Sequence, residues 1–155
     1  MSDPVKKRSK LDDLEQVQVH SRAELRAWLR KNHTRTTGVW LVSYKKSVPA
    51  KYLDYASIVE EALCFGWIDS TARGLDEERS MLHFCPRKPG SAWSKVNKER
   101  IERLVASGRM TKAGLAKIEA AKKDGSWTAL DAVEALVVPT DLQRALAANK
   151  NAKKH

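Results

Sequence analysis

The hydrophobic and polar positions in the first part of the chain change from the period of a strand to the period of a helix. Residues 16–20, Gln-Val-Gln-Val-His, alternate between polar and apolar side chains, as a short strand does. The next four residues, Ser21-Arg-Ala-Glu24, have the Ser-x-x-Glu form of a capping box, and Leu25, Trp28 and Leu29 after them share one helical face. The pattern predicts a strand followed directly by an amphipathic helix.

In the middle of the chain, strand patterns flank one apolar helix. Residues 38–44, Gly-Val-Trp-Leu-Val-Ser-Tyr, are rich in β-branched and aromatic side chains and predict a largely buried strand. A helix is expected to begin at Asp54, which is a good N-cap, and to end at Gly66. Residues 67–73 and 80–85 then predict a β-hairpin.

The last third of the chain has a helical pattern throughout. Four helix starts are predicted, capped by Ser91 or Ser94, by Thr111, by Thr128 and by Thr140. Together the patterns predict one α+β domain over residues 15–148, with a small mixed β-sheet, helices and a C-terminal helical bundle. Residues 1–14, which are basic, and residues 149–155 lack periodicity and are expected to be flexible tails.

The charge of the chain favours an anionic partner. Lysine and arginine total 29 against 19 acidic residues among 155, a net charge of +10. The excess is concentrated, because residues 86–123 hold 11 basic and 3 acidic side chains, whereas residues 55–85 hold 2 basic and 6 acidic ones. Such a field suits nucleic acid or phosphorylated ligands. A solubilising N-terminal tail, with Lys6, Lys7, Arg8 and Lys10, is the alternative explanation for part of the net charge.

The cysteines and the absence of apolar runs bear on location and on metal binding. Cys64 and Cys85 have apolar or aromatic neighbours and are expected to be reduced thiols of a cytoplasmic protein. No stretch approaches the roughly 20 apolar residues of a membrane span, so no membrane insertion is expected. His83 and Cys85 share a strand face near Cys64, but their spacing is weak evidence for zinc. We expect neither a metal nor another cofactor.

A first candidate site lies on the predicted strand 67–73. Trp67, Asp69, Thr71 and Arg73 alternate along it and therefore share a face, and the small residues between them are assigned to the packed side. An indole, a carboxylate and a guanidinium in one row are suited to stack on a planar ligand and to bind its edge. Cross-strand ion pairing is the alternative role for the charged members.

A second candidate site is the loop before the predicted helix at residue 94. Helix N-termini bind anions through free N–H groups and the helix dipole, and basic and hydroxyl side chains surround this one. The ligand-binding candidates in the loop are Arg87, Lys88, Ser91, Trp93, Ser94, Lys95 and Asn97. In the alternative, Ser94 caps its own helix, Trp93 is a core anchor, and the two basic residues of the loop are solvated.

Several segments resemble the bacterial YdeI/OmpD-associated family, whose members are often labelled bacteriocin-protection proteins. The resemblance rests on Ala62-Leu-Cys-Phe-Gly-Trp-Ile-Asp-Ser70, on Phe84-x-Pro-Arg-Lys and on Ser91-x-Trp-Ser-Lys-x-Asn97. It continues through Gly125-x-Trp127 and covers roughly residues 16–148. It implies an α+β fold, a cytoplasmic location and a context of bacteriocin tolerance, without a defined molecular activity. A more distant likeness to the YjbR/CyaY-like superfamily, for which nucleic-acid binding has been proposed, fits the basic charge.

Two main hypotheses of function follow. The first is a non-enzymatic module that binds nucleic acid or a phosphorylated ligand through the two candidate sites, with a link to bacteriocin tolerance or envelope stress implied by the resemblance. The alternative is a small enzyme for an envelope- or stress-related metabolite, in which Asp69 is the acid or base and Arg87 holds the substrate. A protein-interaction adaptor is a further alternative, and its apolar patch would comprise Leu130, Val133, Leu136 and Val137.

Overall fold

The fold is a small mixed β-sheet with helices, as the sequence predicts. The structure is a computed structural model, and it describes residues 10–133. The elements in chain order are η1 (Lys10–Asp13), β1 (Gln16–Gln18), α1 (Arg22–Asn32), β2 (Val39–Tyr44), α2 (Tyr55–Cys64), β3 (Trp67–Gly74), β4 (Arg79–Pro86), α3 (Lys95–Ala106) and α4 (Lys112–Asp124). The α+β prediction is therefore confirmed.

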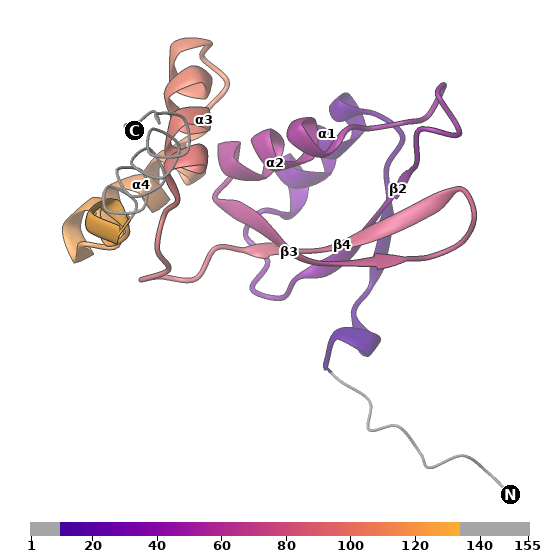
Figure 1. Ribbon diagram of the computed structural model, residues 1–155, viewed down its shortest axis with the longest axis horizontal. Helices are drawn as coiled ribbons and strands as arrows, with labels where there is room; N and C mark the ends of the chain where they lie inside the picture. Colours follow the sequence, from indigo (N-terminus) through magenta and orange to yellow (C-terminus); the bar gives the residue numbers. More distant parts are fainter. Residues whose placement is uncertain (1–9, 134–155) are drawn as a thin grey trace, which may run out of the picture.

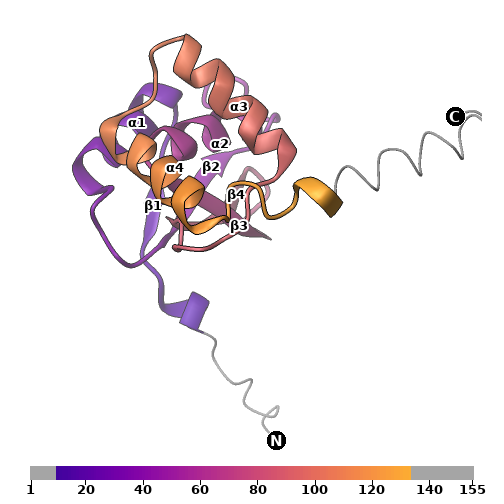
Figure 2. The ribbon, with the colours of Figure 1, turned by 90° about the vertical axis from the view of Figure 1, so that its left-hand side faces the viewer.

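The sheet has the strand order β1-β2-β4-β3. β1 pairs with β2 in parallel, whereas β4 is antiparallel to both β2 and β3, so the sheet is mixed and the predicted hairpin is formed by β3 and β4. α1 and α2 lie over one face of the sheet, and α3 and α4 stand together at one end of it (Figure 1). Figure 2, viewed from that end, shows α3 and α4 in front of the rest of the fold. Of the predicted C-terminal helices, the one beginning at Thr140 lies outside the described residues.

Side-chain caps begin the helices where the sequence predicts them. The side chains of Ser21, Asp54, Ser94 and Thr111 each accept a hydrogen bond from the backbone N–H three residues later, which satisfies one of the free donors of the first turn. Ser94 rather than Ser91 is therefore the cap of α3. The capping assignments are confirmed for α1, α2, α3 and α4. Of the helix predicted to begin at Thr128, residues 131–133 are helical, and its remainder lies outside the described residues.

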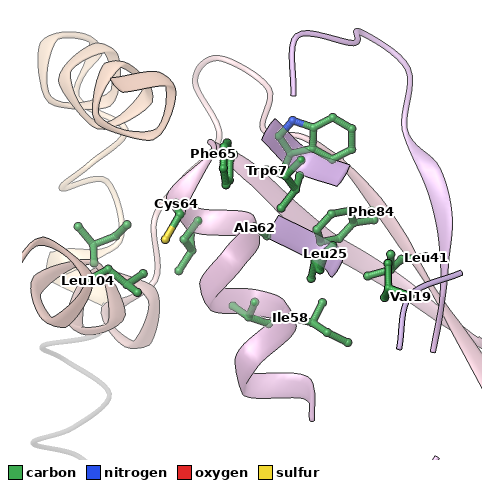
Figure 3. Packing of buried hydrophobic residues seen from close by; sticks show 14 of the residues in the cluster. Val19, Leu25, Leu41, Ile58, Ala62, Cys64, Phe65, Trp67, Phe84 and Leu104 are labelled. Atoms are coloured by element: carbon green, nitrogen blue, oxygen red, sulfur yellow. The ribbon is translucent and has the colours of Figure 1, made fainter. Parts of the chain in front are cut away.

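The core lies between the sheet and the two helices that cover it. Trp67 is 1% exposed and packs with Phe84 and Leu25, as Figure 3 shows. Leu104 of α3 joins this cluster beside Cys64, which connects the helical end of the molecule to the main core. Cys64 is buried and Cys85 is half-buried, and both are free thiols.

A close backbone contact fixes α4 against the end of α2. The Thr111 hydroxyl donates to the Cys64 carbonyl oxygen at 2.6 Å, and the Thr111 N–H donates to the same oxygen at 3.1 Å. A Cβ on Gly114 would stand 2.3 Å from that oxygen, so only glycine fits there. The contact carries Lys117, one turn further along α4, to a position beside Gly66.

A β-bulge separates the predicted row of Trp67, Asp69 and Arg73. Asp69 pairs with Phe84 and Ala72 pairs with Leu82, so the register of β3 shifts by one residue between them. A shift of one residue exchanges the two faces of a strand. Trp67 and Asp69 therefore face the helices, whereas Arg73 faces the other side. The prediction of one shared ligand-binding face was wrong, as was the assignment of the small residues to the packed side.

The described part of the predicted N-terminal tail, residues 10–14, is not a flexible segment but packs on the sheet. Residues 10–13 form η1, where the Leu11 carbonyl oxygen accepts a 2.7 Å hydrogen bond from the Trp40 indole. Asp12 forms a 2.9 Å ion pair with Arg73, whose guanidinium lies 4.7 Å from the Trp40 ring centre. These contacts bury Trp40 on the face away from α1 and α2. Among residues 10–133, no helix is long and apolar enough to cross a membrane.

Candidate anion-binding site

Arg87 is held at the end of β4 by backbone bonds on both sides. Its N–H donates to the Gly66 carbonyl oxygen at 2.9 Å, and its carbonyl oxygen accepts from the Lys117 ammonium at 2.7 Å. The chain then turns through Pro89 and Gly90, where φ is +81°, before it reaches α3. The backbone of Arg87 is thus tied both to the start of β3 and to α4.

The side chain of Arg87 is a buried cation. It is 4% exposed, and its guanidinium carbon lies 3.8 Å from the centre of the Trp93 ring. Nη2 donates to the Ala92 carbonyl oxygen at 2.5 Å, but Nε and Nη1 are shielded from solvent and have no hydrogen-bond partner among the described residues. No ion pair within the described residues involves Arg87. Burial lowers its pKa, yet an arginine so far above neutrality stays charged.

This arrangement is energetically costly. A buried N–H group without a partner costs about 1–3 kcal/mol, and a buried charge without a counter-ion costs several kcal/mol. Stacking on Trp93 returns only about 2 kcal/mol, the upper range for a desolvated cation–π contact. An anion brought to the guanidinium would offset much of the remaining cost.

Two openings meet at Arg87. The smaller is a cavity of about 50 Å³ between the loop and α4, lined among others by Ser91, Trp93, Asp124 and Ser126. Asp124 forms no ion pair with Arg87, and its Oδ1 instead accepts from both the N–H and the hydroxyl of Ser126. These bonds lower the pKa of Asp124, with a further contribution from the Gly90 N–H. A fixed carboxylate makes this side unfavourable for a second anion.

The larger opening is a groove of about 620 Å³ on the other side. It lies at the end of the sheet where β2 begins, β4 ends and β3 begins, and its volume is within the 300–1,000 Å³ of small-molecule sites. Four cationic side chains line it, those of Arg35, Arg87, Lys88 and Lys117, and no carboxylate is among its lining residues. The groove is therefore electropositive along its length.

The cations of the groove differ in how free they are. Arg35 is paired with Glu15 at 2.9 Å, and the Lys117 ammonium holds the Arg87 carbonyl. Lys88 is exposed. Burial lowers the pKa of His83, which also lines the groove, and the charge of Lys88 lowers it further, so its ring is neutral at pH 7. Arg87, Lys88 and Lys117 thus provide most of the attraction for an anion, because of the four lining cations only Arg35 is paired with a carboxylate.

The structure brings four of the predicted loop residues together. Arg87 and Lys88 line both openings, and Ser91 and Trp93 line the smaller one. The prediction of solvated basic residues holds for Lys88 but is wrong for Arg87. Trp93 is 2% exposed, so it is a core anchor and a stacking surface at once.

The other predicted site residues lie elsewhere or have structural roles. Ser94 caps α3, Lys95 is exposed on its first turn, and the Asn97 side chain accepts from Arg100 at 3.0 Å. Asp69 accepts a 2.7 Å bond from the Tyr55 hydroxyl and lines neither opening. Trp67 borders the groove but donates its indole N–H to the His33 carbonyl oxygen within the core.

Sequence reasoning missed the other walls of the groove. Lys117 comes from α4, and residues 33–36 and 38 come from the loop between α1 and β2. Because these residues are far from Arg87 in the sequence, no local sequence pattern indicates that they lie beside it. Gly66 was predicted only as the end of a helix. In the structure it has a positive φ of 77°, and the Lys117 side chain packs on it, so Gly66 and Lys117 lie together at the groove.

A second charged cluster surrounds Glu61 and has a structural role. This carboxylate is fully buried and accepts from Arg22, Arg26 and Arg109 at 2.5, 2.8 and 2.6 Å. Burial alone would raise the pKa of Glu61, but the three hydrogen bonds outweigh it and hold the pKa below its usual range. The cluster joins α1, α2 and the α3–α4 connection.

The remaining candidates add no further chemistry. Within residues 10–133, no group of three metal-ligating side chains is close enough to hold a metal ion. The patch predicted for an adaptor is only partly described, with Val133 exposed and Leu136 and Val137 outside the described residues. A separate groove between α3 and α4 is lined mainly by apolar side chains such as Val105 and Leu115.

Comparison with known proteins identifies a family and no individual relative. Neither the curated proteins nor the solved structures yield a match to this chain. The family described as "Domain of unknown function (DUF8412)" matches residues 17–117, from β1 to the Lys117 that borders the groove. The chain belongs to this DUF8412 family.

Proposed function

We propose that the protein is a binding module for a small anionic ligand, and that Arg87 is the residue that holds the anion. The observation that carries the proposal is a guanidinium that is 4% exposed and has no carboxylate partner among the described residues. Guanidinium groups bind phosphate and carboxylate strongly, and more so when they are withdrawn from water. The absence of acidic residues from the groove lining supports the same assignment.

Access to Arg87 requires a small movement of the loop. Its Nε and Nη1 are shielded from solvent, and the three residues that follow it in the loop, Lys88, Pro89 and Gly90, are all exposed. Gly90 has no atom within 4 Å of its Cβ position, so this segment has space to shift. The unsatisfied donors beneath it raise the energy of the closed state and therefore favour opening toward an anion.

The enzyme hypothesis gains no support from the geometry. It requires Asp69 and Arg87 to face one cleft, whereas Asp69 lies under α2 with Tyr55 and lines neither opening.

The resemblance to the YdeI/OmpD-associated family leads us to propose bacteriocin tolerance or envelope stress as the context in which to seek the ligand. A cytoplasmic location is part of that proposal.

Thermal unfolding in phosphate tests the proposal. The chain and its Arg87→Met variant are unfolded in increasing inorganic phosphate, with sodium chloride adjusted to constant ionic strength. A ligand that binds only the folded state stabilises it by RT ln(1 + [L]/Kd), about 2.7 kcal/mol at one hundred times Kd. We expect a saturable rise in Tm for the unmodified chain and none for Arg87→Met.

Arg103→Met is the matched control. It removes the same charge from α3, and Arg103 is exposed and lines neither opening. Its response to phosphate should equal that of the unmodified chain. An equal response from Arg87→Met would refute the assignment. Labelled oligonucleotides at two salt concentrations form a parallel measurement, in which steeply salt-dependent binding that survives Arg87→Met would indicate a nucleic-acid surface instead.

A further inference from the structure

The groove beside Arg87 is larger than an inorganic anion needs. Its 620 Å³ extends from the Arg87 end to the loop at residues 33–38, and it has the size of a site for a small organic molecule. The cavity on the other side of Arg87, at about 50 Å³, has room for only about three water molecules. A ligand of organic size therefore has space only on the groove side.

The groove is lined by cations and by apolar or small residues. The cations are Arg87, Lys88 and Lys117, together with Arg35, whose charge is paired with Glu15. The rest is lined largely by apolar or small residues, namely Gly38, Phe65, Cys85, Pro86, Pro89 and Ala113. Uncharged polar side chains occur among them, including Thr34, Thr36 and the neutral His83. An anionic head and an uncharged body with a few hydroxyl groups match these two kinds of lining residue.

The floor of the groove is rigid. A Cβ on Gly38 would stand 2.7 Å from the Cys85 Cβ and 3.0 Å from His83 Nε2, so the loop backbone presses directly on β4. The His83 ring is fixed by a 2.8 Å hydrogen bond with the Ser70 hydroxyl. Because these groups are already in place, binding a ligand body would order few additional side chains.

We infer that the ligand is a phosphomonoester of a small, otherwise uncharged organic molecule, with its phosphate at Arg87 and Lys88 and its body along the groove toward Thr36. This inference rests on the proposed function. A phosphate carries up to two negative charges and three acceptor oxygens, which suits several clustered cationic donors better than a carboxylate does. The body adds affinity by burying its surface against the apolar walls.

A groove-filling variant tests the position of the body. Thr36 is exposed and lines the groove, so Thr36→Trp should fill it without disturbing the core. Thr37→Trp is the matched control, because Thr37 is the same residue type, is also exposed and does not line the groove. Calorimetric titrations use four probes: inorganic phosphate, glucose 6-phosphate, adenosine 5′-monophosphate and glucuronate.

In the unmodified chain and in Thr37→Trp, we expect at least one organic phosphate to bind about tenfold more tightly than inorganic phosphate, a modest gain for several added contacts. Thr36→Trp should lose that gain and keep its affinity for inorganic phosphate. Glucuronate, a carboxylate on a hexose body, should bind more weakly than glucose 6-phosphate.

Three results would overturn the inference. Organic phosphates no tighter than inorganic phosphate would show that the groove contributes nothing, while the role of Arg87 would stand. An unchanged gain in Thr36→Trp would show that the body of the ligand does not lie in the groove. Tighter binding of glucuronate than of glucose 6-phosphate would show that the site prefers a carboxylate to a phosphate. If none of the probes binds the chain at all, the proposed function itself fails, and the inference fails with it.

Discussion

The Arg109 guanidinium donates a 2.6 Å hydrogen bond to the fully buried carboxylate of Glu61. The two residues are 48 positions apart, and the bond ties the α3–α4 connection to α2. Arg26 strengthens the same junction, because it donates both to Glu61 at 2.8 Å and to the Arg109 carbonyl oxygen at 2.8 Å. One buried acid therefore helps to hold the helical end of the molecule, which includes the Lys117 wall of the groove, against α2.

Glu61→Gln should destabilise the fold by about 3 kcal/mol, because it leaves three guanidinium groups around a neutral side chain. Urea unfolding followed by circular dichroism measures the loss. Glu60→Gln is the control, since Glu60 is partly exposed and pairs, among the described residues, only with Arg22, at 3.0 Å. It should cost under about 1 kcal/mol. Equal losses would show that the buried carboxylate has no special role.

The free energy of unfolding should decrease as the pH is lowered, because Glu61 becomes protonated. Its pKa is lower in the folded chain than in the unfolded chain, so the unfolded state binds the proton more readily. The stabilisation is fully present above the unfolded pKa, near 4.5, and is lost as the pH falls through the lower folded value. Urea unfolding between pH 3 and pH 7 should give a shallower acid slope for Glu61→Gln than for the unmodified chain.

Gly114→Ala should destabilise the fold, although alanine is normally favoured over glycine inside a helix by about 1 kcal/mol. The reason for the reversed sign is the Cys64 carbonyl oxygen, which would lie 2.3 Å from the new Cβ. Gly74→Ala is the control, because nothing lies within 4 Å of its Cβ position. Thermal unfolding of the two variants compares them, and a higher Tm for Gly114→Ala would contradict the close packing of α2 and α4.

Arg87→Met should leave stability unchanged or increase it in a buffer free of phosphate and sulfate. Methionine has a similar length, packs against Trp93 and removes a buried charge that lacks a protein partner. Chemical unfolding in dilute chloride measures the change, with Arg103→Met as the surface reference. A loss of several kcal/mol would mean that the guanidinium already has a strong partner in the folded chain.

Trp40→Ala should cost about 3–5 kcal/mol, as expected for removal of a buried aromatic side chain. Trp40 is 2% exposed, donates to Leu11 and lies beneath Arg73. Loss of the Trp40 side chain should therefore also release η1 from the sheet. In a hydrogen-exchange measurement, the η1 amides should lose more protection than the amides of α4. Proteolysis near residue 10 provides a second measurement of the same release.

Local pattern determined the elements of this protein. Ser21, Asp54 and Thr111 were identified as helix caps, and Ser94 as one of two candidates, because a cap depends only on residues within one turn. The hairpin of β3 and β4 followed in the same way from strand periodicity interrupted by turn residues. The candidate loop with Arg87 was also visible, since clustered basic, aromatic and glycine residues are a local signal.

Tertiary structure alone decided which side chains meet and which are withdrawn from water. The bulge after Asp69 moved Arg73 to the opposite face, and periodicity contains no information about a shift in register with another strand. Lys117 and the loop at residues 33–38 reached Arg87 through packing between segments far apart in sequence. The sequence by itself determined that a cationic loop precedes α3. Only the fold determined that Arg87 of this loop is buried against Trp93 without a carboxylate partner in the described region. The physical reason is that the burial of a side chain depends on every segment that packs around it.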